Sequence, residues 1–161
     1  MKSCLVTGSF DPFTLGHLDI VKRAAKLFDK VYIAILVNPL KKCMFSVEDR
    51  LLVAKASTQD MDNVRVVSYA GMASDLAKEL DIKYLVRGIR NNADYVYEYE
   101  MAEYNYINGK VETICLFTDS KMDKVSSTEV RLKLECGEDI KKCVCKDVAA
   151  VIEELYSRRN K

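Results

Sequence analysis

A short apolar segment, a glycine-containing loop and an amphipathic helix follow one another at the start of the chain, and this succession constrains the fold most. Cys4 to Val6 have the composition of a strand, which ends at Gly8. Apolar residues then recur at helical spacing between Leu18 and Phe28. In open α/β sheets, ligands bind where a strand ends and a helix begins, because the first N–H groups of the helix can hold an anion. We therefore predict a phosphate site in this loop, with His17 facing it from the first helical turn.

The loop does not carry the glycine patterns of the common nucleotide-binding folds, since neither G-x-x-x-x-G-K-[ST] nor G-x-G-x-x-G occurs in it. Its sequence G-S-F-D-P-F-T-L-G-H, from Gly8 to His17, instead resembles the T/HxGH signature of the nucleotidylyltransferase superfamily. Gly16 permits close approach of a phosphate to the backbone, because glycine has no β-carbon. His17 is the one histidine of the chain. A lone histidine at such a position is ordinarily a solvated surface residue, but the surrounding motif favours a catalytic role.

The size and charge of the chain exclude several functional classes. With 161 residues, 49% of them hydrophobic, and a formal net charge of +1, residues 1–161 fit a single globular domain without a surface for nucleic acid. The longest apolar run, Val31 to Val37, is far shorter than the roughly 20 residues that a spanning helix needs. No signal-type apolar region follows Met1 and Lys2. We therefore expect a cytoplasmic protein that associates with neither nucleic acid nor membrane.

The six cysteines are expected to be reduced thiols, since no secretory signal accompanies them. Cys143 and Cys145 suggest zinc binding, but they are two residues apart rather than in C-x-x-C spacing. No second pair or neighbouring histidine completes such a site. The sequence therefore predicts no metal site made of protein side chains.

Strand-like apolar segments and helical patterns alternate along the whole chain with short connections. This alternation predicts an α/β fold, a single doubly wound Rossmann-like domain with a five-stranded parallel sheet and right-handed crossovers. The expected strands are residues 4–6, 30–37, 63–68, 83–86 and 111–117, and the expected helices are residues 18–28, 51–59, 72–80, 93–107, 126–137 and 147–157. The helix over 51–59 continues from a capping box at Ser46 to Asp49, and Gly137 ends the helix that begins at Ser126.

The carboxyl edge of that sheet is predicted to gather cationic and hydroxyl side chains. They are Ser9, His17, Lys41, Arg87, Arg90 and Ser126 to Thr128. The set contains neither a Ser-His-Asp order nor a paired acid and base. It suits phosphoryl or nucleotidyl transfer, in which a protein positions anions and neutralises their charge. The alternatives are a solvated surface for the basic residues and simple helix capping for the three hydroxyls.

Four sequence blocks resemble the bacterial phosphopantetheine adenylyltransferases over nearly the whole length of the chain. Besides the block from Gly8 to His17, they are N-P-L-K-K at Asn38 to Lys42, R-G-I-R-N-N-A-D-Y-V-Y-E at Arg87 to Glu98 and V-S-S-T-E-V-R at Val125 to Arg131. The resemblance implies the nucleotidylyltransferase fold. It also implies transfer of the adenylyl group of ATP to 4'-phosphopantetheine, which gives dephospho-coenzyme A and pyrophosphate in coenzyme A biosynthesis.

The resemblance further implies roles for individual residues. Ser9, where the family usually has threonine, touches the phosphates of both substrates, and Lys41 holds the acceptor phosphate near the α-phosphate of ATP. Ser9, His17 and Lys41 are thus the expected catalytic residues, and Met72 and Arg87 also line the acceptor site. The residues implied for ATP binding are Ser9, Phe10, His17, Gly88, Ile89, Arg90, Glu98, Met122, Asp123, Lys124, Val125, Ser126, Ser127 and Thr128.

The expected mechanism needs no general base. A phosphate monoester with a second pKa of about 6 is already a dianion at neutral pH, and it can attack the α-phosphorus of ATP in line without a covalent intermediate. We expect His17 to donate to the α-phosphate in the transition state, and Lys41 to neutralise the incoming phosphate. Mg2+ is expected to be bound through the ATP phosphates, because the sequence shows no carboxylate cage for it.

The sequence leaves several alternatives open. Within the same class of enzyme, a related nucleotidylyltransferase would act on nicotinamide mononucleotide or a polyol phosphate. Outside it, the chain would be a non-catalytic nucleotide or coenzyme A sensor, or have an assembly role suggested by the tyrosine-rich segment from Ala93 to Ile107. That segment is more simply a subunit interface, and the resemblance implies a homohexamer with dephospho-coenzyme A and coenzyme A as product-side ligands. Glu98 could instead pair with a lysine or arginine on the helix surface.

Overall fold

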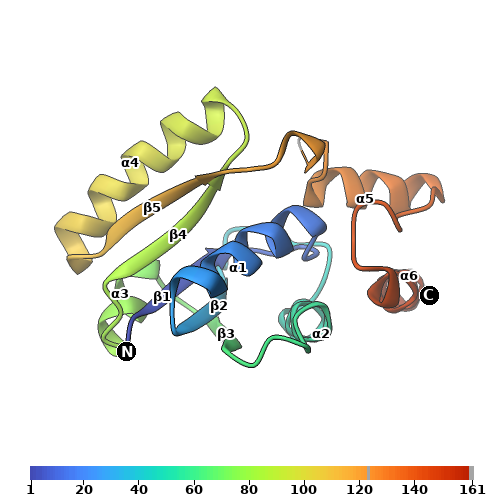
Figure 1. The fold of residues 1–161 in the computed structure, drawn as a ribbon. Coiled ribbons are helices and arrows are strands. Elements are labelled where there is room, and N and C mark those ends of the chain that lie inside the picture. Colours follow the sequence, from blue (N-terminus) through green and yellow to red (C-terminus); the bar gives the residue numbers. More distant parts are fainter. Residues whose placement is uncertain (123, 160–161) are drawn as a thin grey trace.

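The computed structural model describes residues 1–122 and 124–159. Five parallel strands form one sheet in the order β3-β2-β1-β4-β5, and helices pack on both of its faces (Figure 1). The predicted α/β fold with its five-stranded parallel sheet is confirmed. The strands are β1 (Ser3–Gly8), β2 (Lys30–Leu36), β3 (Val64–Tyr69), β4 (Tyr84–Ile89) and β5 (Glu112–Phe117). The helices are α1 (Leu15–Leu27), α2 (Val47–Ser57), α3 (Ala73–Glu79), α4 (Asn92–Gly109), α5 (Ser127–Cys136) and α6 (Lys146–Arg159), with a 3-10 turn at Ser120–Met122.

The two faces of the sheet bury cores of different size. The larger core packs α1, α2, α5 and α6 against one face and includes Val6 and Val86. The smaller core lies between the opposite face and α3, and it includes Leu5 and Leu76. Because neighbouring strand residues point to opposite faces, Leu5 and Val6 belong to different cores. The inner strands are therefore buried on both sides, which explains their unbroken apolar sequences.

Several elements extend further than the sequence predicts, and β4 is the one that bears on the site. β4 continues to Ile89, whereas its expected end is Val86. The neighbouring strand sets this extension, since the ladder between β4 and β5 continues as far as the pair of Ile89 and Phe117. Arg87 and Gly88 are therefore strand residues and not loop residues. α6 is also longer than expected, by one residue at its start and two at its end.

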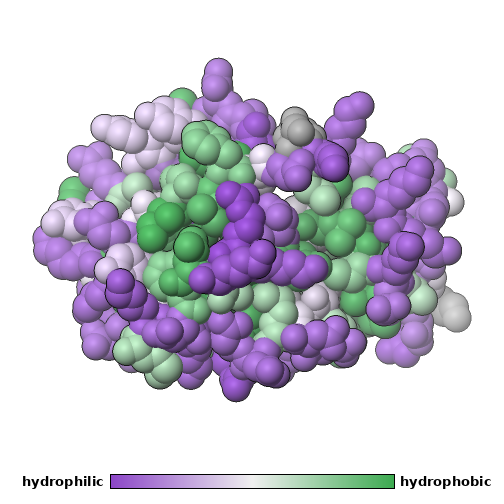
Figure 2. Space-filling model, viewed as in Figure 1, coloured by the Kyte–Doolittle hydropathy of each residue, from purple (hydrophilic) through white to green (hydrophobic). Residues whose placement is uncertain are grey.

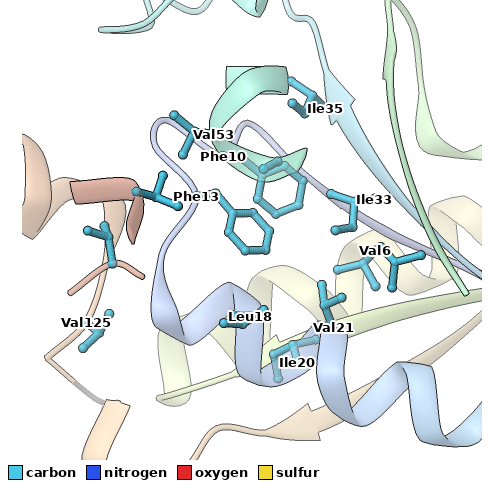
Figure 3. Close-up of a cluster of buried hydrophobic side chains, with 14 of the residues drawn as sticks. Val6, Phe10, Phe13, Leu18, Ile20, Val21, Ile33, Ile35, Val53 and Val125 are labelled. Atoms are coloured by element: carbon cyan, nitrogen blue, oxygen red, sulfur yellow. The ribbon is translucent and has the colours of Figure 1, made fainter. Parts of the chain in front are cut away.

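Two phenylalanines anchor the loop between β1 and α1. Phe10 and Phe13 are 3% and 1% exposed, and their ring centroids are 5.4 Å apart. Figure 3 shows both rings inside a cluster that also contains Ile33 of β2 and Val53 of α2. Phe10 has a φ angle of 48°, in the left-handed region that residues other than glycine rarely adopt. Burial of its ring therefore stabilises an otherwise unfavourable loop backbone.

The state of the cysteines and the length of the helices concern two expectations from the sequence, namely reduced thiols and no membrane-spanning segment. All six cysteines are free thiols, and burial raises the pKa of Cys4 to about 12. In the ranges 1–122 and 124–159, no helix is both long and apolar enough to cross a membrane.

Candidate active site

A cavity of about 530 Å³ opens at the carboxyl edge of the sheet, between β1 and β4. These strands are neighbours, yet the chain winds from β1 through β2 to β3 and then crosses to the other side of β1 to form β4. The winding direction thus reverses between them, and ligands bind at such switch points in open α/β sheets. The residues around the cavity include Thr7, Gly8, Phe10, His17, Arg87, Gly88, Arg90, Asp94, Glu98, Thr118, Val125 and Ser126 to Thr128.

The first turn of α1 holds the ring of His17 in one orientation. Thr14 is the N-cap of α1, and its backbone N–H donates to Nδ1 of His17 across 3.0 Å. The backbone N–H of His17 donates in return to Oγ1 of Thr14, at 3.5 Å. A neutral imidazole carries its proton on the nitrogen that is not acting as an acceptor. The proton of a neutral His17 ring is therefore on Nε2.

The surroundings of His17 keep its ring neutral. The ring packs against Phe10 and Phe13, with centroid distances of 5.0 and 5.4 Å. Burial, followed by repulsion from Arg87 and Arg90, lowers the pKa of His17 from 6.5 to about 4. At neutral pH this side chain is consequently a hydrogen-bond donor through Nε2–H and carries no charge.

Arg87 is held rigidly by Glu98 and Thr7. Its Nε lies 2.9 Å from each carboxylate oxygen of Glu98, and its Nη2 lies 2.6 Å from Oε1. Its Nη1 donates to the carbonyl oxygen of Thr7 and, at 3.0 Å, to Oγ1 of Thr7. A guanidinium has five N–H hydrogens, so these contacts leave one on Nη2 without a partner among the described residues. Glu98 thus pairs with an arginine, as the alternative interpretation expects, but it is 6% exposed and its partner is the strand residue Arg87 and not a residue on the helix surface.

Arg90 is paired with Asp94 in the first turn of α4. The Nε and Nη2 atoms of Arg90 lie 2.9 and 3.2 Å from the carboxylate oxygens of Asp94. Burial alone would raise the pKa of Asp94, but hydrogen bonds from the side chain and backbone of Arg90 hold it below its ordinary value. Both arginines of the cavity therefore have a carboxylate partner.

Lys41 and Ser9 meet beside the cavity. Nζ of Lys41 donates to Oγ of Ser9 across 2.9 Å, although the two residues are 32 positions apart in the sequence. Among the described residues, no carboxylate lies within salt-bridge distance of Lys41. Its ammonium group can therefore serve an incoming anion without first leaving a carboxylate.

The three consecutive hydroxyls at the start of α5 have partners within the protein. Oγ of Ser126 accepts from the backbone N–H of Glu129 at 3.1 Å, which is a helix cap. Ser127 donates to the carbonyl oxygen of Pro12 at 2.8 Å, and Oγ1 of Thr128 lies 3.2 Å from Nη2 of Arg131. The capping interpretation therefore applies to Ser126. All three residues nevertheless line the cavity.

Most residues expected at the site do gather there. Lining residues from the expected set are Phe10, His17, Arg87, Gly88, Arg90, Glu98, Met122, Val125, Ser126, Ser127 and Thr128. Ile89 is buried, and its carbonyl oxygen accepts from Thr118. Met72 occupies the N-cap position of α3, Lys124 is exposed, and Ser9 and Lys41 meet beside the cavity, so none of these four residues lines it. The expected role of Asp123 lies outside the described residues.

Several lining residues were not expected at the site from the sequence, among them Asp94, Ile20 and Thr118. Asp94 has a recognisable signal, because it stands four residues after Arg90 at the start of a helix. Ile20 and Thr118 have no such signal, because their place at the cavity comes from packing against Gly88, which is far from both of them in the sequence. A β-carbon on Gly88 would lie 3.0 Å from Cγ1 of Ile20 and 3.5 Å from Cγ2 of Thr118. The absence of a side chain at Gly88 therefore lets Ile20 and Thr118 pack directly against β4.

A parallel sheet with a cavity at its switch point defines the class of Rossmann-like α/β folds, which bind their ligands at that point. A solved structure from Vibrio parahaemolyticus, assigned as a nicotinate-nucleotide adenylyltransferase, has the same fold, with a TM-score of 0.71. It shares 20% sequence identity with this chain, and the match covers 97% of this chain and 96% of the other.

Sequence comparisons narrow the class to a family. Residues 5–133 match the family model described as Cytidylyltransferase-like. The curated phosphopantetheine adenylyltransferase of Flavobacterium psychrophilum is 45% identical to this chain, and the match covers 86% of this chain and 92% of the relative. That of Clostridium tetani is 39% identical, and the match covers 99% of both chains. The relative from Clostridium novyi is 42% identical over 81% of this chain and 82% of its own. The chain belongs to the cytidylyltransferase-like family and, within it, to the phosphopantetheine adenylyltransferases.

Proposed function

We propose that the chain transfers the adenylyl group of ATP to 4'-phosphopantetheine. An oxygen of the acceptor phosphate forms a bond to the α-phosphorus of ATP, while the bond from that phosphorus to the oxygen bridging the β-phosphate breaks. The products are dephospho-coenzyme A and pyrophosphate. The names and coverage of the relatives support this acceptor.

The observation that carries the proposal is the neutral, oriented imidazole of His17. Its pKa of about 4 and the hydrogen bond at Nδ1 make Nε2–H a fixed donor in the cavity. Negative charge on the α-phosphate oxygens is redistributed in the transition state, and a donor fixed in advance stabilises it without reorganisation. No step requires His17 to take up a proton. This agrees with an acceptor that is already a dianion.

The remaining polar groups divide between the two substrates. On the acceptor side, Lys41 and Ser9 meet the incoming phosphate, and Arg87 offers the one N–H on Nη2 that Glu98 and Thr7 leave available. Met72 is also proposed to line the acceptor site. On the ATP side the proposal keeps Phe10, His17, Gly88 to Arg90, Glu98 and the segment from Met122 to Thr128, including Asp123 and Lys124.

Mg2+ would be held chiefly by the phosphates of ATP. Asp94 and Glu98, the carboxylates that line the cavity, are each bound to an arginine. Within residues 1–122 and 124–159, no three histidine, cysteine or acidic side chains are grouped so that they could hold a metal ion. When bound, the ion would shield the triphosphate and favour the departure of pyrophosphate.

A homohexamer is part of the proposal and is supported by the surface of α4. Tyr99, Tyr106 and Ile107 are 66%, 50% and 63% exposed on this helix. α4 lies beside β5 at the edge of the molecule (Figure 1), and the face in Figure 2 shows residues of intermediate hydropathy over it.

Coenzyme A and dephospho-coenzyme A are proposed as product-side ligands. The free thiols support a cytoplasmic location.

The test is pyrophosphate release from ATP and Mg2+ with three acceptors in parallel: 4'-phosphopantetheine, nicotinamide mononucleotide and glycerol 3-phosphate. We expect turnover only with 4'-phosphopantetheine. Turnover with another acceptor would replace the substrate and keep the chemistry. Tight ATP binding without turnover on any acceptor would make the chain a sensor.

A further inference from the structure

We propose that Asp11 is a positioning residue, whose carboxylate holds the segment that carries Lys41 in place beside Ser9. The inference rests on the proposed function, because Lys41 is the residue being positioned. Asp11 lies within the motif from Gly8 to His17, but it is not among the residues expected at the site.

The carboxylate of Asp11 binds the far end of the Lys41 segment directly. Oδ2 accepts from the backbone N–H of Met44 and Oδ1 from that of Phe45, both across 2.8 Å. Asp11 is 5% exposed and Phe45 is 4% exposed, so these bonds are shielded from water. Each carboxylate oxygen thus has one backbone donor, over a sequence separation of 33 and 34 residues.

Besides the packing of Met44 and Phe45 against the larger core, few other contacts hold the segment. Leu40 is 94% exposed, and the backbone N–H groups of Leu40 and Lys41 bind only Asn38, two and three residues away. Among residues 1–122 and 124–159, the hydrogen bonds that tie residues 38–45 to distant parts of the chain end on Ser9 or Asp11. The Ser9 bond involves the flexible, exposed end of a lysine. Asp11 is therefore the buried anchor of the segment.

The anchor is itself fixed, so it can transmit order to Lys41. Nη1 of Arg131 on α5 donates to the carbonyl oxygen of Asp11 at 2.6 Å and lies 3.7 Å from Oδ2. Two residues earlier, Nη1 of Arg50 donates to the carbonyl oxygen of Ser9 at 2.8 Å. Ser9 and Asp11 are thus held by arginines of two different helices, Ser9 by Arg50 of α2 and Asp11 by Arg131 of α5. The loop that binds Lys41 and the anchor of its segment consequently form one rigid unit.

The change Asp11→Asn tests the role with little change of shape. The amide has one acceptor oxygen and one NH2 group, so in either orientation an N–H of Met44 or Phe45 faces another donor. We expect hydrogen–deuterium exchange in a peptide spanning residues 38–46 to become at least about tenfold faster, because a buried hydrogen bond is lost. Asp60→Asn, on the exposed end of the α2–β3 connection, is the control and should leave this peptide unchanged.

Kinetics separate positioning from a general effect on the fold. Asp11→Asn should lower kcat/KM for the acceptor by about 10- to 100-fold while the ATP dissociation constant changes less than about threefold. In a Lys41→Ala background the same change should cost less than about threefold, since Asp11 then has no lysine to position. Equal losses in both backgrounds would overturn the proposal, as would unchanged exchange in residues 38–46.

Two outcomes keep this inference distinct from the proposed function. If the wild type does not use 4'-phosphopantetheine, the proposed function fails, and the exchange measurement still decides whether Asp11 anchors the segment. If Asp11→Asn unfolds, Asp11→Ser retains one acceptor oxygen and takes its place in both measurements. Thermal unfolding and ATP binding of each variant show that it is folded before its kinetics are compared.

Discussion

The backbone N–H of Thr14 donates to Nδ1 of His17 across 3.0 Å, so the cap that begins α1 also fixes the tautomer of the imidazole. The side chain of Thr14 caps the helix, since its Oγ1 accepts from the backbone N–H of His17, and the same Oγ1 also lies 3.1 Å from Nδ1 of the ring. The backbone N–H of Thr14 thus orients the ring, whereas its hydroxyl caps the helix and also contacts the ring. Substitutions can separate the two effects.

Thr14→Ala should lower the free energy of unfolding by about 1 kcal/mol or somewhat more, because it removes the cap from a buried position. It should reduce kcat by less than about fivefold, because the backbone N–H that orients His17 remains. Chemical denaturation and steady-state kinetics measure the two effects. Thr14→Ser keeps the hydroxyl and is the matched control. A loss of kcat as large as that of His17→Ala would mean that Oγ1 orients the ring.

The protonation of His17 can be followed without assignment, because the chain has one histidine. Its pKa is lowered from 6.5 to about 4, so the unfolded chain binds more protons than the folded one between these values. The contribution of His17 to stability is therefore complete above pH 6.5 and is lost as the pH falls to about 4. Nitrogen-15 NMR should show one neutral ring, protonated at Nε2, from pH 8 to pH 5. A midpoint near 6.5 in the folded protein would contradict this account.

The ion pair of Arg87 and Glu98 should matter more for stability than an exposed pair. The two side chains are 22% and 8% exposed, and Glu98→Gln would leave the guanidinium partly buried without its counter-charge. We expect a loss of about 1–3 kcal/mol in the free energy of unfolding. Glu154→Gln removes an exposed pair with Arg158 and should cost less than about 0.5 kcal/mol.

The same variant has a signature in ligand binding. The phosphate of 4'-phosphopantetheine, which Arg87 faces in the proposed function, would supply part of the missing negative charge, so this ligand should raise the Tm of Glu98→Gln more than that of the wild type. An equal rise in both proteins would indicate that Arg87 does not face the anion.

A charge placed on the exposed surface of α4 should prevent assembly and leave the fold of the protomer intact. Tyr99 is 66% exposed, and Tyr99→Lys would put an ammonium group into any interface formed there. Sedimentation should give a hexamer for the wild type and smaller species for the variant, with unchanged circular dichroism. Leu52→Lys, on the half-exposed surface of α2, is the control. A wild type that sediments as a monomer at micromolar concentration would refute the hexamer.

The elements that could be predicted are those whose information is local. The apolar run of β2, the capping box that begins α2 at Ser46 and the glycine that ends α5 are each readable within a few residues. The same is true of the strand, loop and helix that bring His17 to the carboxyl edge. General rules of winding predict right-handed crossovers and place His17 and Arg87 at the same carboxyl edge, whereas the order of the strands comes from the structure.

The parts that could not be predicted depend on distant partners. β4 extends to Ile89 because β5 continues to pair with it. Glu98 is buried because it meets a strand residue 11 positions earlier. Asp11 lies within the recognised motif, but nothing local indicates that its carboxylate binds the backbone of Met44 and Phe45. Such contacts become visible only once the sheet has brought the loops together.

The most direct test of the central claim compares His17→Ala with the wild type in ATP binding and in turnover with 4'-phosphopantetheine. If His17 acts on the transition state through Nε2–H, kcat should fall by about 100- to 1,000-fold while the ATP dissociation constant changes less than about threefold. An unchanged kcat, or a loss confined to ATP affinity, would contradict the account.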